Sequence, residues 1–156
     1  MNQKAELKRK ESKFEVQTYL DKLKHSINSG SVKINFQGNR LVDKSRDEKY
    51  SNRFTLGKLF PDEDDIVVLK RELLLLTIDE YIETIKDTKF PKRSEMRVFG
   101  KQYGGDDVYI KIRVELVNIT HASGGSFILV MSFHYSTREF TENDFPFKKV
   151  ENRKNE

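Results

Sequence analysis

The sequence predicts a single α+β domain, with an antiparallel sheet of three to four strands and helices packed on one face. Residues 108–116 alternate apolar and polar side chains, which is typical of a strand with one face on a core. Residues 127–131 are apolar at nearly every position, as expected of a central strand. Between Val16 and Ile27, apolar residues recur at spacings of three and four, which predicts a helix.

Composition sets the outer bounds on function. The chain has 156 residues, 35% of them charged and 36% hydrophobic, with a net charge of +4 that weakly favours an anionic partner. It has no cysteine, so disulfides and thiolate metal sites are excluded. No apolar run approaches the ~18 residues of a membrane span, and the polar N-terminus does not resemble a signal peptide. We therefore expect a cytoplasmic protein without a membrane partner.

The N-terminal third begins with a polar stretch. We expect residues 1–13 to be a flexible N-terminal extension and residues 14–147 to form the domain. The first helix should end at Ser29, because Gly30 suits the left-handed position after a helix. Lysines surround this helix, and a solvated surface explains them more simply than a nucleic-acid-binding face; they are Lys10, Lys13, Lys22 and Lys24.

A short strand is predicted at residues 32–36, where apolar and polar residues alternate. Residues 39–53 are polar and predict a loop with at most one turn of helix. Four residues after this loop should anchor it to the core ahead of Pro61, namely Phe54, Leu56, Leu59 and Phe60.

The middle of the chain predicts two further helices. Residues 62–65 are all acidic, which suits the N-terminus of a helix carrying the apolar stripe of residues 66–76. A calcium or magnesium site is the alternative, but the tract lacks the spaced ligands and glycine of an EF-hand loop. Thr77 and Glu80 form a capping box, which predicts a second helix over residues 78–87.

Three sequential antiparallel strands should complete the sheet. Residues 95–103 precede a glycine turn, and the hairpin formed by residues 107–135 follows it. In the C-terminal tail, phenylalanines could pack back on the domain; they are Phe140, Phe145 and Phe147. We expect residues 148–156 to be disordered.

No phosphate-binding loop, dinucleotide fingerprint or histidine metal motif is present, so no metal or cofactor is expected. The candidate site is one face of the hairpin. Tyr109, Lys111 and Arg113 share that face by alternation. If Phe127, Leu129, Met131 and Phe133 face the core, Ser132 and His134 lie on the same side as Tyr109. Either Lys101 or Gln102 could reach the site from the preceding strand.

This set of side chains could cleave RNA, which carries its own nucleophile in the ribose 2′-hydroxyl. Lys111 and Arg113 could hold a phosphate, and Tyr109 and His134 could transfer protons. The simpler interpretation is an ordinary solvated sheet face with His134 at an edge, and the residues alone favour it.

The strand sequence VYIKI and the following run FILVMSFH resemble the MqsR family of bacterial mRNA interferase toxins. The similarity spans about residues 19–135 and is supported by the segment TIDEYIETI before the hairpin. This resemblance implies a RelE/MqsR-like fold. It also implies a hydrolase, an RNA-binding endoribonuclease that cuts mRNA without metal and is neutralised by a cognate antitoxin protein. Contact with the ribosome is a further implication.

Residue by residue, the resemblance places the family's functional tyrosine at Tyr109. His134 occupies the position of a family lysine, and Gln102 that of a family glutamine. The family's helix lysine has its nearest counterpart in Lys86. We therefore expect Tyr109 and His134 to be catalytic, with Lys101, Gln102, Lys111 and Arg113 binding the substrate phosphate.

Two alternatives to a toxin–antitoxin nuclease remain. The same sheet could serve a non-catalytic regulator that binds a protein and is encoded on a mobile element. A DNA-binding regulator that uses the basic first helix is the other alternative.

Overall fold

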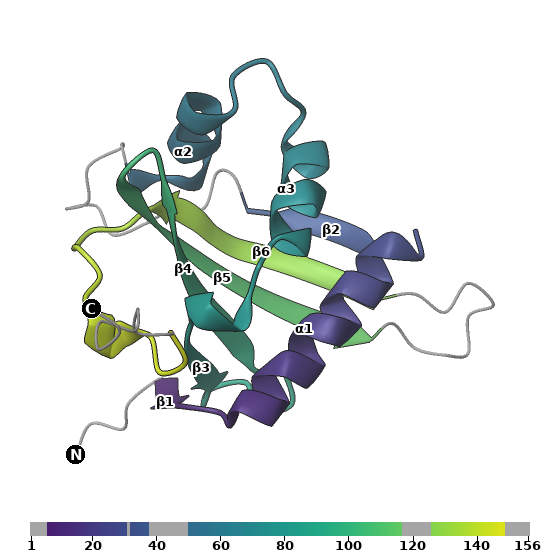
Figure 1. Ribbon diagram of the computed structural model, residues 1–156. Helices are drawn as coiled ribbons and strands as arrows, with labels where there is room; N and C mark the ends of the chain where they lie inside the picture. Colours follow the sequence, from purple (N-terminus) through teal and green to yellow (C-terminus); the bar gives the residue numbers. More distant parts are fainter. Residues whose placement is uncertain (1–5, 31, 38–49, 117–125, 149–156) are drawn as a thin grey trace, which may run out of the picture.

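A computed structural model describes residues 6–30, 32–37, 50–116 and 126–148 of this α+β protein (Figure 1). Its helices are α1 (Lys13–Asn28), α2 (Asn52–Leu59) and α3 (Asp65–Leu74), with short 3₁₀ turns η2 (Ile78–Glu80) and η3 (Glu142–Asp144). The strands are β1 (Glu6–Arg9), β2 (Lys33–Phe36), β3 (Tyr81–Asp87), β4 (Met96–Tyr103), β5 (Asp106–Leu116) and β6 (Ser126–Tyr135).

The sheet is larger than predicted and is mixed. Its six strands lie in the order β1-β3-β4-β5-β6-β2, and β2 pairs in parallel with β6. The prediction of three to four antiparallel strands in a RelE/MqsR-like arrangement is therefore wrong, although the α+β class is correct. β1 escaped prediction because it falls within the expected flexible extension and all four of its residues are exposed, so its sequence has no apolar alternation.

Strand β3 lies where the sequence predicted a helix over residues 78–87, so that prediction is wrong. The capping box of Thr77 and Glu80 does form, but it begins only the 3₁₀ turn η2, and the chain is extended from Tyr81 onward. Ile82, Thr84 and Ile85 are β-branched and favour a strand. The capping signal was thus real, but tertiary pairing with β1 and β4 determined the structure beyond it.

The other predicted elements form as expected, each for a local reason. Ser12 caps α1 with a complete capping box, and Gly30 has φ of +76° after its end. Asp64 caps α3 by accepting a hydrogen bond from the Val67 amide, so this acid of the 62–65 tract serves the helix start. Gly104 and Gly105 both have positive φ in the β4–β5 turn.

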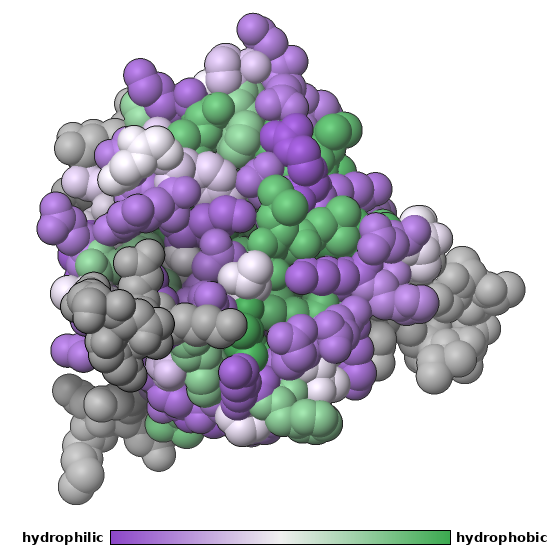
Figure 2. Space-filling model, in the orientation of Figure 1, coloured by the Kyte–Doolittle hydropathy of each residue, from purple (hydrophilic) through white to green (hydrophobic). Residues whose placement is uncertain are grey.

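The main core lies between the sheet and the helices, with α1 and α3 crossing the same sheet face (Figure 1). The outer surface of this side is mostly hydrophilic, with an apolar band at its centre (Figure 2). The largest contributors to the core come from both layers: Leu20, Leu23, Leu69, Leu73, Phe99, Ile110, Ile112 and Phe133.

A buried polar network closes the helix-covered face near the start of α1. The Glu11 carboxylate accepts hydrogen bonds from the Arg97 guanidinium at 2.8 and 3.1 Å and from the Thr84 hydroxyl. The Glu11 amide donates to the Tyr81 hydroxyl at 3.0 Å. Burial raises the pKa of Glu11, but the hydrogen bonds from Arg97 and Thr84 outweigh it and leave that pKa below its usual value.

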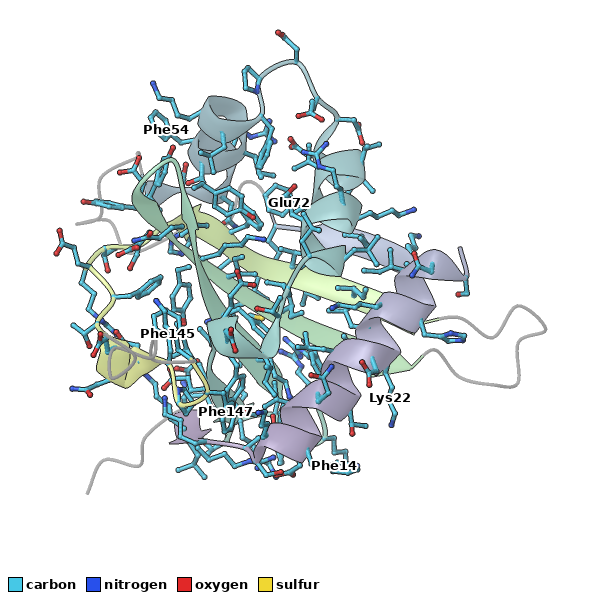
Figure 3. All side chains as sticks on the ribbon, viewed as in Figure 1. Phe14, Lys22, Phe54, Glu72, Phe145 and Phe147 are labelled. Carbon is cyan, nitrogen blue, oxygen red and sulfur yellow. The ribbon has the colours of Figure 1, made fainter. Side chains whose placement is uncertain are left out.

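We use the name cleft face for the sheet face opposite α1 and α3. Four of its apolar residues form a second cluster, namely Ile82, Ile85, Met96 and Val98. Residues 136–148, the C-terminal segment, pack against it through Phe140 and Phe145. Phe147, which is labelled in Figure 3, instead stacks on Tyr81 with ring centroids 5.9 Å apart. The expectation that the tail phenylalanines pack back on the domain is confirmed; residues 149–156 lie outside the described residues.

Candidate functional site

A cleft of about 310 Å³ opens on the cleft face, between β5, β6 and the C-terminal segment. Side chains from both strands and from the segment form its walls; those that matter for its chemistry are Tyr109, Lys111, Ser132, His134 and Arg138. Asn52, at the start of α2, also borders it. The cleft therefore combines an imidazole, a phenol and two cationic side chains.

Tyr109 and His134 are directly opposite each other on β5 and β6. Their rings stack, with centroids 5.5 Å apart and planes inclined by 20°. Both side chains lie on one face of the sheet, as alternation along β5 requires. Stacking fixes the orientation of the imidazole relative to the phenol.

The local hydrogen bonding of His134 also determines which ring nitrogen can exchange protons. Nδ1 lies 2.8 Å from the carbonyl oxygen of Tyr135. A carbonyl oxygen can only accept, so Nδ1 carries the hydrogen and donates it. In the neutral ring, Nε2 then holds the lone pair and is the nitrogen able to act as a base.

A β-bulge places His134 on this face. Lys111 pairs with Ser132, but Ile112 pairs with Val130, so Met131 is an extra residue in β6. The core residues of β6 are consequently Ile128, Val130 and Phe133. The predicted core set was correct for Phe133 but wrong for Leu129 and Met131, which are only partly buried; the side chain of Phe127 lies outside the described part of the chain.

Asn52 stabilises this irregularity in β6. Its amide nitrogen donates to the carbonyl oxygens of Met131 at 3.0 Å and Gln37 at 2.7 Å, while its side-chain oxygen accepts from the Phe133 amide at 3.0 Å. One buried side chain thus satisfies three backbone groups where regular ladder pairing stops. The α2 segment, predicted only as part of a polar loop and its anchors, therefore helps to orient the site.

Lys111 and Arg113 follow Tyr109 along the same side of β5. Their side chains are well covered, with exposed fractions of only 8% and 7%. Lys111 lines the cleft, whereas Arg113 lies farther along the strand, with Nη2 3.8 Å from the Met131 sulfur. Such burial restricts a long cationic side chain to few conformations.

The structure does not bring Lys101 or Gln102 into the cleft. Lys101 alternates to the opposite face, where its Nζ lies 3.9 Å from a Glu80 carboxylate oxygen and 5.7 Å from the Tyr103 ring centroid. Gln102 alternates to the cleft face near the glycine turn, where its amide donates to Asp107 at 3.1 Å. The two candidates from β4 are therefore separated from the cluster of Tyr109, Lys111 and His134.

Arg138 is the cleft residue that sequence reasoning missed. It belongs to the C-terminal segment and lies in the cleft wall, where its guanidinium donates two hydrogen bonds to the Asp144 carboxylate, at 2.8 and 2.9 Å. The hydrogen bond from Arg138 lowers the pKa of Asp144 to about 2. In the sequence, Arg138 belongs to a polar tail, and the only signal for its ordering is the set of phenylalanines that follow it.

Among the residues that the structure describes, no group of three or more acidic or histidine side chains is arranged to hold a metal ion. No helix in the described part of the chain has the length and apolar character needed to cross a bilayer.

Comparison with known proteins adds no family assignment. No protein-family model, curated protein or solved structure matches this chain.

Proposed function

We propose that this protein is an endoribonuclease that cleaves mRNA without a metal ion, as the toxin of a type II toxin–antitoxin pair. The observation that carries this proposal is the stacked pair of Tyr109 and His134 in a cleft that Lys111 also lines. An acid–base pair beside a fixed cation is sufficient for a substrate that supplies its own nucleophile.

The reaction begins when Nε2 of His134 accepts the proton of a ribose 2′-hydroxyl. The 2′-oxygen then attacks the adjacent phosphorus, and the bond from phosphorus to the 5′-oxygen breaks. The departing 5′-oxygen takes a proton from the Tyr109 hydroxyl. The products are a 2′,3′-cyclic phosphate and a 5′-hydroxyl end, and proton return from His134 to Tyr109 restores the site.

Lys111 and Arg138 supply positive charge for the phosphate oxygens, whose charge increases in the transition state. Arg113 adds to the positive potential from farther along β5. Asp144 holds the Arg138 guanidinium by two hydrogen bonds, so this cation is oriented before substrate arrives.

The biological role in the proposal comes from the resemblance of the hairpin to MqsR toxins. It comprises an mRNA substrate, a cognate antitoxin protein that blocks the cleft, contact with the ribosome, and action in the cytoplasm. This part of the proposal is separate from the chemistry, because a nuclease with another role would use the same cleft.

The decisive experiment incubates the purified protein with mRNA in EDTA and maps the cut ends. Discrete cuts with 2′,3′-cyclic phosphate ends are expected. His134→Ala should lower the cleavage rate about 10²- to 10⁴-fold, the usual contribution of a general base, and Tyr109→Phe should also lower it. His25→Ala is the matched control, because His25 is exposed on α1.

Circular dichroism should show that each variant remains folded, and induction in cells should show relief of growth arrest for the two cleft variants. Undiminished cleavage by both His134→Ala and Tyr109→Phe would exclude these two residues as the catalytic pair. Intact RNA together with a tight protein complex would instead favour a non-catalytic, protein-binding regulator.

A further inference from the structure

A second cleft adjoins the first, across the C-terminal segment. Its volume is about 680 Å³, and it lies between α2, the β4–β5 turn and the end of β6. Ser136, Thr137, Arg138 and Phe140 border both clefts. A ligand that extends beyond the first cleft along this wall would therefore enter the second.

Phe54 makes the second cleft unusual. Sequence analysis predicted that this side chain anchors the loop to the core, but 42% of it is exposed, whereas Leu56, two residues later, is buried. Its ring meets Tyr135 edge-on, with centroids 6.4 Å apart and planes inclined by 62°. Figure 3 shows Phe54 on α2 at the periphery of the molecule. Two aromatic rings thus line one end of an open cleft.

These rings are held rigidly relative to the first cleft. Tyr135 directly follows His134, and its amide donates to the Thr55 hydroxyl at 2.9 Å. The Phe54 amide donates to the Ser51 cap at 3.2 Å. The α2 helix that carries Phe54 is also fixed to β6 by Asn52. The backbone positions of both aromatic residues are therefore fixed relative to the proposed base.

The charges around the second cleft favour a base rather than a phosphate as its occupant. Its lining includes two cations, Lys58 and Arg138, and three acids, Asp106, Asp107 and Glu139. Asp107 is already engaged, because it accepts from Gln102 and from the Phe140 amide. Asp106 and Glu139 are exposed, and carboxylates at such positions accept hydrogen bonds from the amino groups of nucleobases.

We propose that the second cleft binds the unpaired base of a nucleotide next to the scissile phosphate, through stacking on Phe54 and Tyr135. This inference rests on the proposed function of the first cleft and names its substrate as single-stranded RNA. A paired base cannot enter, because its face is already stacked within the duplex.

The test measures binding of a short single-stranded RNA that contains 2-aminopurine, whose fluorescence is quenched by stacking. His134→Ala protein is used so that the RNA stays intact. Adding Phe54→Ala should weaken binding about 5- to 150-fold and abolish the quench, since stacking on an aromatic side chain contributes about 1–3 kcal/mol per base. Phe54→Trp should preserve both.

Phe14→Ala is the matched control, because Phe14 is an exposed aromatic residue on α1. It should leave binding unchanged, and a duplex of the same sequence should bind more weakly than the single strand. In the active protein, Phe54→Ala should raise KM more than it lowers kcat.

The outcomes separate this inference from the proposed function. Equal affinity and quench with and without Phe54 would overturn the base-binding cleft even if the protein cleaves RNA. If Phe54→Ala abolished the quench but the protein never cleaved RNA, base binding in the second cleft would be supported and only the nuclease function would be excluded.

Discussion

Buried charged side chains lie in different surroundings on the two faces of the sheet. On the helix-covered face, Glu11 is 5% exposed and is paired with Arg97 through two hydrogen bonds. On the cleft face, Lys111 and Arg113 carry the same sign, lie two residues apart on β5, and are covered to a similar extent. The ion pair of Glu11 and Arg97 contributes to the fold, whereas in the proposed function the cations of the cleft face serve to bind a phosphate.

The largest expected effect comes from a substitution that breaks the buried polar network on the helix-covered face. Glu11→Gln removes the carboxylate and leaves the Arg97 guanidinium, whose side chain is only 16% exposed, without its ion-pair partner, so the free energy of unfolding should fall by about 3–5 kcal/mol. Denaturant unfolding measures this loss. Lys8→Gln is the control, because Lys8 is exposed and its ion pair with Glu83 is long at 3.6 Å; it should cost less than about 1 kcal/mol. If Glu11→Gln lowered the free energy of unfolding by less than about 1 kcal/mol, the buried ion pair would contribute no more to stability than an exposed one.

A middle effect concerns the packing that attaches the C-terminal segment to the cleft face. A Cβ at Gly100 would lie 2.6 Å from the Phe140 ring and 3.0 Å from Ile82, so Gly100→Ala should displace the segment. Overpacking of this kind costs about 1–3 kcal/mol, and limited proteolysis should cleave the segment sooner. Gly57→Ala is the matched control, since its Cβ would meet nothing within 4 Å inside α2 and should stabilise the helix.

If Phe140 is the obstacle, Phe140→Leu should recover part of the loss in the double variant. If Gly100→Ala and Gly57→Ala proved equally stable, the C-terminal segment would accommodate the added methyl group without loss of stability.

The smallest effect is a pH dependence at the cleft wall. The hydrogen bond from Arg138 lowers the pKa of Asp144 from 3.8 to about 2. Because the folded-state pKa is the lower one, the stabilisation is complete above about pH 4 and is lost as the pH falls toward 2. Arg138 is 60% exposed, so solvent screening limits the contribution to about 1 kcal/mol or less.

Asp144→Asn isolates this contribution. The variant should be less stable than the wild type at pH 6 and equally stable near pH 2, as measured by thermal unfolding. A difference that stays constant across this range would show that the negative charge of Asp144 does not stabilise the segment; the backbone hydrogen bond from Thr141 does not distinguish the two proteins, because an amide oxygen can accept it as well.

The sequence predicted β5 well because regular alternation determines a face without any tertiary information. Ile110 and Ile112 enter the core, and Tyr109 and Lys111 lie on the other side, as the period of two requires. In β6 the same reasoning succeeded for Phe133 and His134 but failed for Leu129 and Met131. The bulge depends on Asn52, which is 79 residues away in the chain, so no local pattern records it.

The remaining errors share a cause. β1 and β3 form because each pairs with a neighbouring strand, although the local sequences suggested an extension and a helix. Arg138 reaches the cleft because Phe140 packs over Gly100, where the absence of a side chain leaves room. Contacts between distant segments decide these features, and a single sequence shows them only as isolated glycines and phenylalanines.

The extra residue at Met131 acts as a phase shift within β6. Without the bulge, unbroken alternation from Val130 onward would put Ser132 and His134 on the side of the helices and Phe133 on the cleft face. Removing Met131 itself would instead leave a regular ladder, with His134 still opposite Tyr109.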